Sequence, residues 1–280
     1  MSDAVGDLRE QIAQAREEAD AEFRPRAERA LSKWSVRTSE VEVGGLSCQV
    51  IEPADGNARS TMLYFFGGGF VMGSPENDLP ITAALSSLGS KRVIAPRYGL
   101  SPEHTFPIAI EQAFEVYRAL IGTDPLTVCG ESAGGGLTLA ILQKADRENL
   151  PMPERIALLS PWCDLRDVAA TKSADIDDPL LEAESLRLFA ATYLNGASAD
   201  DQSASPLLAP YNASWPDTLL TTGSRDRLRY MVNDLASKIV SGGGQCDVID
   251  VPDMPHVFEI YDENPEALDT LKRITEFLRP

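Results

Sequence analysis

Short apolar runs and amphipathic stretches alternate along most of this chain. A continuous apolar run is typical of a buried strand, whereas apolar residues spaced three and four apart are typical of a helix that packs on one side. Strands are predicted at Met62–Phe66, Lys91–Ala95, Leu126–Cys129, Ile156–Leu159, Leu219–Thr222 and Cys246–Val251. Helices are predicted at Ile81–Leu88, Ile108–Ile121, 135–144, Tyr230–Val240 and Pro265–Leu278. This order predicts an α/β fold in which helices flank a mostly parallel central sheet.

The residues before the first buried strand have two other patterns. Residues 5–33 repeat apolar positions at helical spacing among many charges. We expect one or two amphipathic helices there, divided near Pro25, because proline interrupts a helix. Residues 36–53 alternate apolar and polar positions, which predicts an antiparallel pair of strands that turns at Gly44 and Gly45.

A long connection interrupts the alternation between the fourth and fifth predicted strands. It spans about sixty residues, far more than such a connection needs. It contains a helix signal, with Asp178 as N-cap, Pro179 in the first turn, Glu182 placed for a capping box, and Gly196 just past the end. We expect this insertion and the N-terminal helices to pack together as a cap over the carboxyl ends of the strands. The predicted organisation is 1–40 as an N-terminal helical cap segment, 41–164 as the first part of the α/β core, 165–212 as a cap insertion, and 213–280 as the second part of the core.

Composition narrows the class of partner. The 280 residues carry 43 acidic and 25 basic side chains, a net charge of −18, which argues against binding to nucleic acid or to an anionic membrane surface. The four cysteines are widely separated, so we expect reduced core residues and neither a zinc site nor a disulfide framework. No apolar stretch has the length of a signal peptide or of a membrane span, which predicts a cytoplasmic protein without membrane insertion.

A serine lies between a predicted strand and a predicted helix. Residues 130–134 read Gly-Glu-Ser-Ala-Gly and follow an apolar run directly. In such a strand–turn–helix the serine hydroxyl is exposed above the strand end, and the residues two before and two after it lie so close to other backbone that both must be glycine. The amide of Ala133 then points toward an oxyanion formed at the serine. The motif therefore predicts Ser132 as a nucleophile.

A serine hydroxyl needs a base, and the base needs an acid that orients it. Of the two histidines, His256 follows the last predicted strand, at the carboxyl edge of the sheet, whereas His104 precedes the serine. Serine enzymes of this strand–turn–helix type have the order serine, acid, histidine, so His256 is predicted as the base and His104 as a structural residue. Asp226 is predicted as the acid because its loop follows the strand Leu219–Thr222 and lies at the same edge.

Three consecutive glycines complete the candidate site. Gly67, Gly68 and Gly69 follow the first buried strand, and their loop can bring amide donors to an oxyanion at the serine. The spacing of Gly67, Gly69 and Gly73 does not fit a dinucleotide-binding loop, and no basic or ribose-binding pattern follows, so no nucleotide cofactor is expected.

These motifs together resemble the hormone-sensitive-lipase family of α/β-hydrolases, the bacterial esterases among them. The resemblance extends from about Tyr64 to Phe277. Phe66–Phe70 is similar to the family's His-Gly-Gly-Gly-Phe loop, and Arg97–Pro107 is similar to its Tyr-Arg-Leu-Ala-Pro-Glu-His-Pro-Phe-Pro stretch. Gly130–Gly134 matches the nucleophile elbow, Ser160–Leu165 a typical Ser-Pro-Trp-x-Asp-Leu, and Gly223–Leu228 the acid loop.

The resemblance implies both a mechanism and a set of residues. It implies an α/β-hydrolase fold with a helical cap and hydrolysis of short- to medium-chain esters or lactones through an acyl-enzyme, with no metal or cofactor. A small-molecule ester is the expected partner, and a homodimer is compatible with the family. The implied site consists of a catalytic triad and an oxyanion hole, formed respectively by Ser132, Asp226 and His256, and by the amides of Gly68, Gly69 and Ala133.

Three positions depart from the family pattern. Phe66 replaces the histidine that helps to pin the glycine loop by hydrogen bonds, so packing must hold the loop instead. Arg227 stands where proline usually follows the acid, and Val257 stands where glycine usually follows the histidine. Near the serine, Phe66, Phe70 and Val257 are predicted to contact the substrate.

Two other functions remain compatible with the motifs. One is an arylformamidase-like amide hydrolase, or a lyase that uses the same site. The other is a ligand-binding protein without activity, as in the gibberellin receptors, which keep this fold but have lost the catalytic histidine. Retention of His256 favours an enzyme.

Overall fold

A computed structural model describes residues 2–122, 125–168, 172–173 and 175–279. Its centre is a sheet of eight strands in the order β1-β2-β4-β3-β5-β6-β7-β8. The strands are β1 (Val36–Val43), β2 (Leu46–Pro53), β3 (Ser60–Phe65), β4 (Lys91–Pro96), β5 (Leu126–Glu131), β6 (Arg155–Leu159), β7 (Asp217–Gly223) and β8 (Cys246–Val251). β2 is antiparallel to β1 and β4, and the six strands from β3 to β8 are parallel. The predicted fold class and the predicted antiparallel pair are confirmed.

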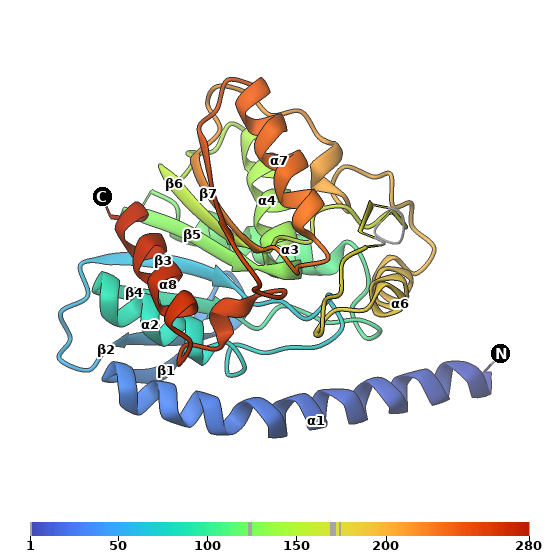
Figure 1. The fold of residues 1–280 in the computed structure, drawn as a ribbon, viewed down its shortest axis with the longest axis horizontal. Helices are drawn as coiled ribbons and strands as arrows, with labels where there is room; N and C mark the ends of the chain where they lie inside the picture. The colour runs from blue at the N-terminus through green and yellow to red at the C-terminus, as the bar shows by residue number, and fades with distance from the viewer. Residues whose placement is uncertain (1, 123–124, 169–171, 174, 280) are drawn as a thin grey trace.

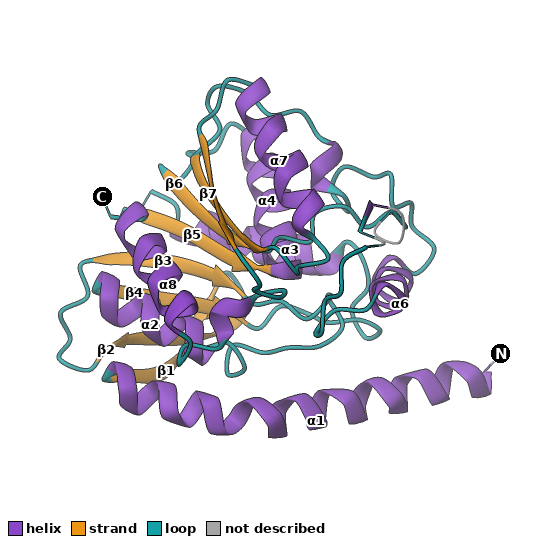
Figure 2. Cartoon of the chain, in the orientation of Figure 1, coloured by secondary structure: helices purple, strands orange, loops and turns teal. Residues whose placement is uncertain are grey.

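Helices cover both faces of the sheet. They are α1 (Ser2–Trp34), α2 (Leu79–Gly89), α3 (Ile108–Leu120), α4 (Ser132–Arg147), α6 (Ala183–Leu194), α7 (Arg229–Ser241) and α8 (Pro265–Phe277), with 3-10 turns η1 (Pro206–Leu208) and η2 (Phe258–Ile260). α2 and α8 lie on one face, and α3, α4 and α7 lie on the other (Figures 1 and 2). Because both faces are covered, the inner parallel strands β3, β4, β5 and β6 are buried on both sides over most of their length, which explains their apolar runs.

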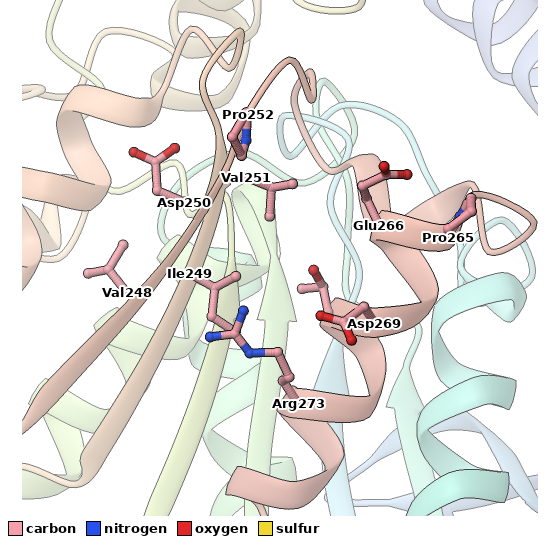
Figure 3. A pocket seen from close by; sticks show the side chains of 10 residues that line it. Val248, Ile249, Asp250, Val251, Pro252, Pro265, Glu266, Asp269 and Arg273 are labelled. Atoms are coloured by element: carbon pink, nitrogen blue, oxygen red, sulfur yellow. The ribbon is translucent and has the colours of Figure 1, made fainter.

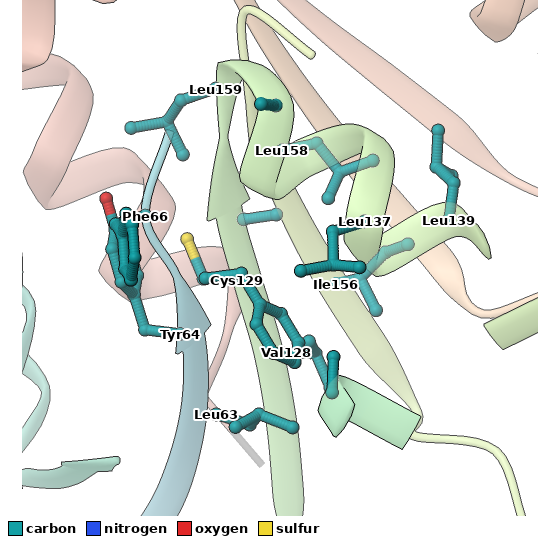
Figure 4. Close-up of a cluster of buried hydrophobic side chains, with 14 of the residues drawn as sticks. Leu63, Tyr64, Phe66, Val128, Cys129, Leu137, Leu139, Ile156, Leu158 and Leu159 are labelled. Carbon is teal, nitrogen blue, oxygen red and sulfur yellow. The ribbon is translucent and has the colours of Figure 1, made fainter. Parts of the chain in front are cut away.

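The core around β5 fixes the position of the strand–turn–helix motif. Leu63, Val128 and Ile156 lie on three adjacent strands, and Leu137 of α4 packs with them (Figure 4). All four side chains are fully buried. Since such packing penalises any displacement of β5 against α4, it also holds the turn that joins them.

The N-terminal segment is one helix, and the predicted division near Pro25 is wrong. α1 continues through the proline to Trp34. Tertiary contacts hold the helix on both sides of the proline: the guanidinium of Arg16 donates to the carbonyl oxygens of Val71 and Ser101, and Lys33 and Trp34 both donate to the Asp262 carboxylate. These contacts offset the one hydrogen bond that proline removes.

The helix of the insertion begins later than predicted. α6 starts at Ala183 with Glu182 in the N-cap position, and the predicted N-cap, Asp178, lies outside the helix. The Asp178 carboxylate instead accepts hydrogen bonds from the amides of Leu180 and Arg227, at 3.0 Å each. A long-range contact with the loop after β7 therefore replaces the expected cap.

The parallel strands direct their carboxyl ends to one edge, where the loops after β3, β5, β7 and β8 meet. Among the described residues, no helix combines the length and the apolar character that a bilayer span requires.

Candidate active site

The turn between β5 and α4 is so tight that the backbone leaves room only for glycine on either side of Ser132. Ser132 has φ +48°, a strained value for a residue with a side chain. A Cβ atom on Gly130 would lie 2.5 Å from the carbonyl oxygen of Gly134, and one on Gly134 would lie 2.0 Å from the carbonyl oxygen of Phe65. Since no side chain fits at either position, the serine stays at the apex of the turn.

The structure brings the three candidate triad residues together from separate loops. Nε2 of His256 lies 3.0 Å from Oγ of Ser132, and Nδ1 of His256 lies 3.0 Å from Oδ1 of Asp226. Asp226 is fully buried, and Ser132 is 9% exposed. A substrate can therefore reach the serine, while the carboxylate is shielded from water.

The Asp226 carboxylate is held by neighbours other than the histidine. The amide of Leu228 donates to Oδ1 at 2.8 Å, and the hydroxyl of Thr222 donates to Oδ2 at 3.1 Å. The hydroxyl of Ser160 also hydrogen-bonds to this carboxylate. These bonds fix the acid in the orientation that meets Nδ1 of His256.

Arg227, which stands where the related enzymes usually have proline, ties the acid loop to the insertion. Its guanidinium donates to the carbonyl oxygens of Leu181, Ser173 and Ile176 at 2.7 to 3.1 Å. Its amide donates to Asp178, as described above. The arginine thus supplies attachments that a proline ring lacks.

His256 and Asp226 each stabilise the charged form of the other. Burial alone would raise the pKa of Asp226, but the charge of His256 and the hydrogen bonds to the carboxylate outweigh burial and hold this pKa below its usual value. Burial alone would lower the pKa of His256, but the charge and hydrogen bond of Asp226 outweigh burial and raise it. A base must be neutral to accept a proton, so activity is expected to fall at acidic pH as His256 protonates.

The glycine loop after β3 offers free amide donors beside the serine. Gly68 and Gly69 have φ values of +97° and +65°, which favour glycine. The loop closes on itself through hydrogen bonds from the amides of Val71 and Met72 to the carbonyl oxygen of Gly68. Within the described part of the chain, the amides of Gly68 and Gly69 donate to no protein group.

Phe66 is held from below by Tyr98. The two rings stack with centroids 4.3 Å apart, and the Tyr98 hydroxyl donates to the carbonyl oxygen of Phe66 at 2.6 Å. Packing and a backbone hydrogen bond thus replace the side-chain hydrogen bonds of the usual histidine, as the sequence predicted.

A cavity of about 300 Å³ opens above Ser132. Its walls combine the glycine loop, the α1 helix, the insertion and the loop after β8; they include Ala19, Glu22, Phe23, Gly67, Gly68, Gly69, Asp78, Glu131, Ser132, Trp162, Leu181, Leu186, Phe189, His256, Val257 and Tyr261. Val257, which is predicted to contact the substrate, lines the cavity.

Phe66 and Phe70 do not line this cavity, contrary to the prediction that they contact the substrate. Phe66 stacks on Tyr98, and Phe70 stacks on Tyr193 with centroids 4.0 Å apart. Both phenylalanines are almost fully buried. Their position next to the glycines suggested substrate contact, but their side chains turn into the core beneath the loop.

A larger hollow, of about 530 Å³, lies between β8 and α8. Its lining includes Asp250, Glu266, Asp269 and Arg273 (Figure 3). No residue of the candidate triad lines it, so the chemistry belongs to the smaller cavity.

Comparison with known proteins agrees with this geometry. Residues 62–260 match the family described as alpha/beta hydrolase fold. This chain belongs to that family. It is 31% identical over 261 residues to an acetyl-hydrolase of Streptomyces hygroscopicus, covering 91% of this chain and 87% of that protein.

Two further members of the family are similar over most of their length. The chain is 27% identical over 240 residues to a versiconal hemiacetal acetate esterase of Emericella nidulans, covering 81% of this chain and 83% of that protein. A crystal structure of a hormone-sensitive lipase from a metagenome library superimposes with a TM-score of 0.87 at 33% identity, covering 95% of this chain and 90% of the other. The predicted similarity to the hormone-sensitive-lipase esterases, and the prediction of a hydrolase, are confirmed.

Three carboxyl groups near the triad of this α/β hydrolase were not predicted from its sequence. Asp78, Glu131 and Glu259 are buried. Glu131 lies within the elbow motif itself, but the motif specifies only the glycines and the serine. Asp78 directly precedes α2 and Glu259 lies in η2, and no sequence pattern indicates that they approach β5.

Replacing Glu259 with glutamine is expected to stabilise the protein in a pH-dependent way. The Glu259 Oε1 accepts from the Thr221 hydroxyl, whereas its Oε2 has no hydrogen-bond partner among the described residues. Burial raises the pKa of Glu259 to about 7. The folded state therefore keeps a proton that the unfolded chain releases near pH 4, so stability is lost as pH rises from about 4 to about 7. Glutamine stays neutral, so the gain in unfolding free energy is expected to be on the order of 1 to 3 kcal/mol at pH 8 and small at pH 4.

Thermal melts of both proteins at the two pH values measure this difference. Glu276→Gln, at an exposed position on α8, is the matched control and should change stability little at either pH. An equal gain for Glu259→Gln at pH 4 and pH 8 would contradict the account.

Proposed function

We propose that this α/β hydrolase cleaves carboxylic esters through an acyl-enzyme on Ser132. The observation that supports this most strongly is the pair of 3.0 Å contacts that join Ser132, His256 and Asp226. The amides of Gly68, Gly69 and Ala133 are proposed as the oxyanion hole. The similarity to an acetyl-hydrolase and to an acetate esterase supports the same class of reaction.

The proposed mechanism has two halves. In the first, His256 accepts the proton of the Ser132 hydroxyl while the serine oxygen attacks the ester carbonyl. The tetrahedral oxyanion binds the loop amides, and the C–O bond to the alcohol breaks as His256 returns the proton to the leaving oxygen. In the second half, water is activated by His256, attacks the acyl-enzyme, and releases the acid and the free serine.

We propose short acyl groups, with acetate as the smallest, for the natural substrate. A cavity of about 300 Å³ is near the lower end of the usual range for ligand pockets. Its lining is more apolar than polar and includes Trp162, Phe189 and Val257. Two relatives are named for acetyl or acetate substrates, which agrees with this size.

The function is tested with p-nitrophenyl esters from acetate to decanoate, each compared with the p-nitroanilide of the same acid. We expect hydrolysis of the short esters, with kcat/KM falling as the chain lengthens, and much slower hydrolysis of the anilides. Inertness toward every ester would overturn the proposal. Faster cleavage of the anilides would favour the amide-hydrolase alternative.

Phe189→Ala is expected to shift the preference toward longer acyl chains. The Phe189 ring lies over the glycine loop, since its Cδ2 atom is 2.4 Å from where a Cβ atom on Gly69 would be. Removing the ring enlarges the cavity beside the oxyanion loop, so the octanoate-to-acetate ratio of kcat/KM should rise roughly tenfold.

Leu188→Ala provides the matched control for this variant. Leu188 is the preceding residue of α6, is 47% exposed, and is not among the residues that line the cavity. An equal shift in both variants would mean that the helix, and not the Phe189 ring, limits chain length.

A further inference from the structure

Two carboxyl groups lie side by side under the glycine loop. Glu131 is the last residue of β5 and precedes Ser132, and Asp78 directly precedes α2. Their exposed fractions are only 6% and 4%. Within the described part of the chain, neither has a lysine or arginine partner.

The two groups are hydrogen-bonded to each other, which requires a proton. Two carboxylates have no donor between them, so one member of the pair is a neutral acid. Asp78 also accepts from the Tyr64 hydroxyl at 2.7 Å, whereas Glu131 accepts from the backbone amide of Gly67. Burial raises the pKa of both groups, and the Asp78 charge raises that of Glu131 further. The proton therefore belongs to Glu131.

With this assignment every hydrogen bond of the pair has a donor and an acceptor. The Tyr64 hydroxyl and the Glu131 hydroxyl both donate to the Asp78 carboxylate, and the remaining oxygen of Glu131 accepts from the Gly67 amide. A buried polar network is stabilising only when it is complete in this way. Among the described residues, Tyr98, Cys129 and Glu259 interact electrostatically with the pair, and none of these three is a cation. His256, Glu22 and Tyr261 line the same cavity.

The pair is in direct contact with the loop that carries the free amides. A Cβ atom on Gly67 would lie 2.1 Å from Oε1 of Glu131, so the loop rests on this carboxyl group. Phe66 contributes no side-chain hydrogen bond to the loop, since its ring is stacked on Tyr98. Glu131 is thus the side chain that links the nucleophile's own strand to the first glycine of the loop.

We propose that the neutral acid Glu131, hydrogen-bonded to Asp78, is a positioning residue that holds the amides of Gly68 and Gly69 at the correct distance from Ser132. This role rests on the proposed ester hydrolysis. Glu131 acts through the loop amides on the oxyanion of the transition state. Its replacement is therefore expected to lower kcat more than it raises KM.

Glu131→Gln and Glu131→Leu test the proposal as a pair. Glutamine reproduces the neutral acid, because its NH₂ group donates to Asp78 and its oxygen accepts from the Gly67 amide. We expect this variant to keep kcat within roughly threefold of wild type, whereas leucine lowers kcat roughly 10- to 100-fold with KM changed less than threefold. A trifluoromethyl ketone inhibits by forming a hemiketal: the Ser132 oxygen adds to the ketone carbonyl, His256 takes the serine proton, and the carbonyl oxygen becomes an oxyanion beside the loop amides. This inhibition should weaken in Glu131→Leu by the same factor as kcat/KM.

Gln143→Leu separates loop positioning from a general loss of stability. Gln143 is a buried polar residue on α4 that donates to the carbonyl oxygen of Pro206, away from the glycine loop. This control is expected to lower the melting temperature without lowering kcat.

The outcomes distinguish this inference from the proposed function. The positioning role is wrong, while ester hydrolysis stands, if wild type hydrolyses esters but Glu131→Gln lowers kcat as much as Glu131→Leu does. The same holds if Glu131→Leu leaves kcat unchanged. If leucine raises KM and leaves kcat unchanged, the residue acts on substrate binding and the inference is also wrong. If wild type neither hydrolyses esters nor binds the ketone, the proposed function fails and this inference fails with it.

Discussion

Replacing Ser132 with alanine is expected to lower kcat/KM for p-nitrophenyl acetate by roughly 10⁴- to 10⁶-fold. The acyl-enzyme requires the serine oxygen, which lies 3.0 Å from Nε2 of His256. Alanine cannot form that intermediate, and water at the same place is neither fixed nor activated to the same degree. Residual activity over the uncatalysed rate would come from the free amides of Gly68 and Gly69 and from substrate binding.

The fold should survive this substitution, which makes the result interpretable. Alanine is smaller than serine, and the strained φ of +48° at position 132 remains accessible at similar cost. Circular dichroism and the melting temperature verify that the variant is folded. A fluorophosphonate probe should label wild type and leave Ser132→Ala unlabelled; labelling of the variant, or retention of its rate, would show that another nucleophile acts.

Replacing Asp226 with asparagine is expected to lower kcat roughly 10²- to 10³-fold. In the well-studied triads this change costs about 10⁴-fold because the histidine adopts the wrong tautomer. Here the Leu228 amide donates to the same oxygen that meets Nδ1 of His256. An asparagine therefore keeps its oxygen there and its NH₂ group toward Thr222, so the tautomer is retained and only the charge is lost.

The pH profile of Asp226→Asn checks this reasoning. In wild type the charge of Asp226 raises the pKa of His256. The proposed mechanism requires His256 to be neutral, since it acts there as the base. Without the charge that pKa falls, so the acidic limb of the kcat profile should move to lower pH. An unchanged acidic limb would mean that this limb does not report on the protonation of His256. A loss of kcat near 10⁴-fold would mean that the asparagine side chain has rotated, so that its NH₂ group faces Nδ1 of His256.

The strand and helix pattern was predictable because it depends on local periodicity and on burial of both sheet faces. The strands from β3 to β8 lie within one or two residues of the predicted apolar runs. The errors fall where distant contacts outweigh local signals. Proline 25 was expected to divide α1, but contacts with the body of the protein hold the helix on both sides of it. Asp178 was expected to cap α6, but it bonds the amide of Arg227 instead.

The candidate triad could be inferred from the sequence because each member follows a predicted strand of a parallel sheet. Strand order and direction then place Ser132, Asp226 and His256 at one edge, whatever the details of packing. Strand order does not specify which loop residues contact the substrate, since neighbouring residues in a loop point in different directions. Phe66 and Phe70 turn into the core, whereas Val257 faces the cavity.

The sequence by itself determined the fold class, the elbow around Ser132 and the order of the candidate triad residues along the chain. These features follow from the spacing of apolar residues along the chain and from the need for glycine where two backbone segments approach closely. Both signals can be read from a few consecutive residues. Only the tertiary structure decided that Glu131 meets Asp78 beneath the glycine loop and that Arg227 ties the acid loop to the insertion. Such contacts join residues far apart in the chain, and their energies depend on burial and on paired donors and acceptors, which no local pattern specifies.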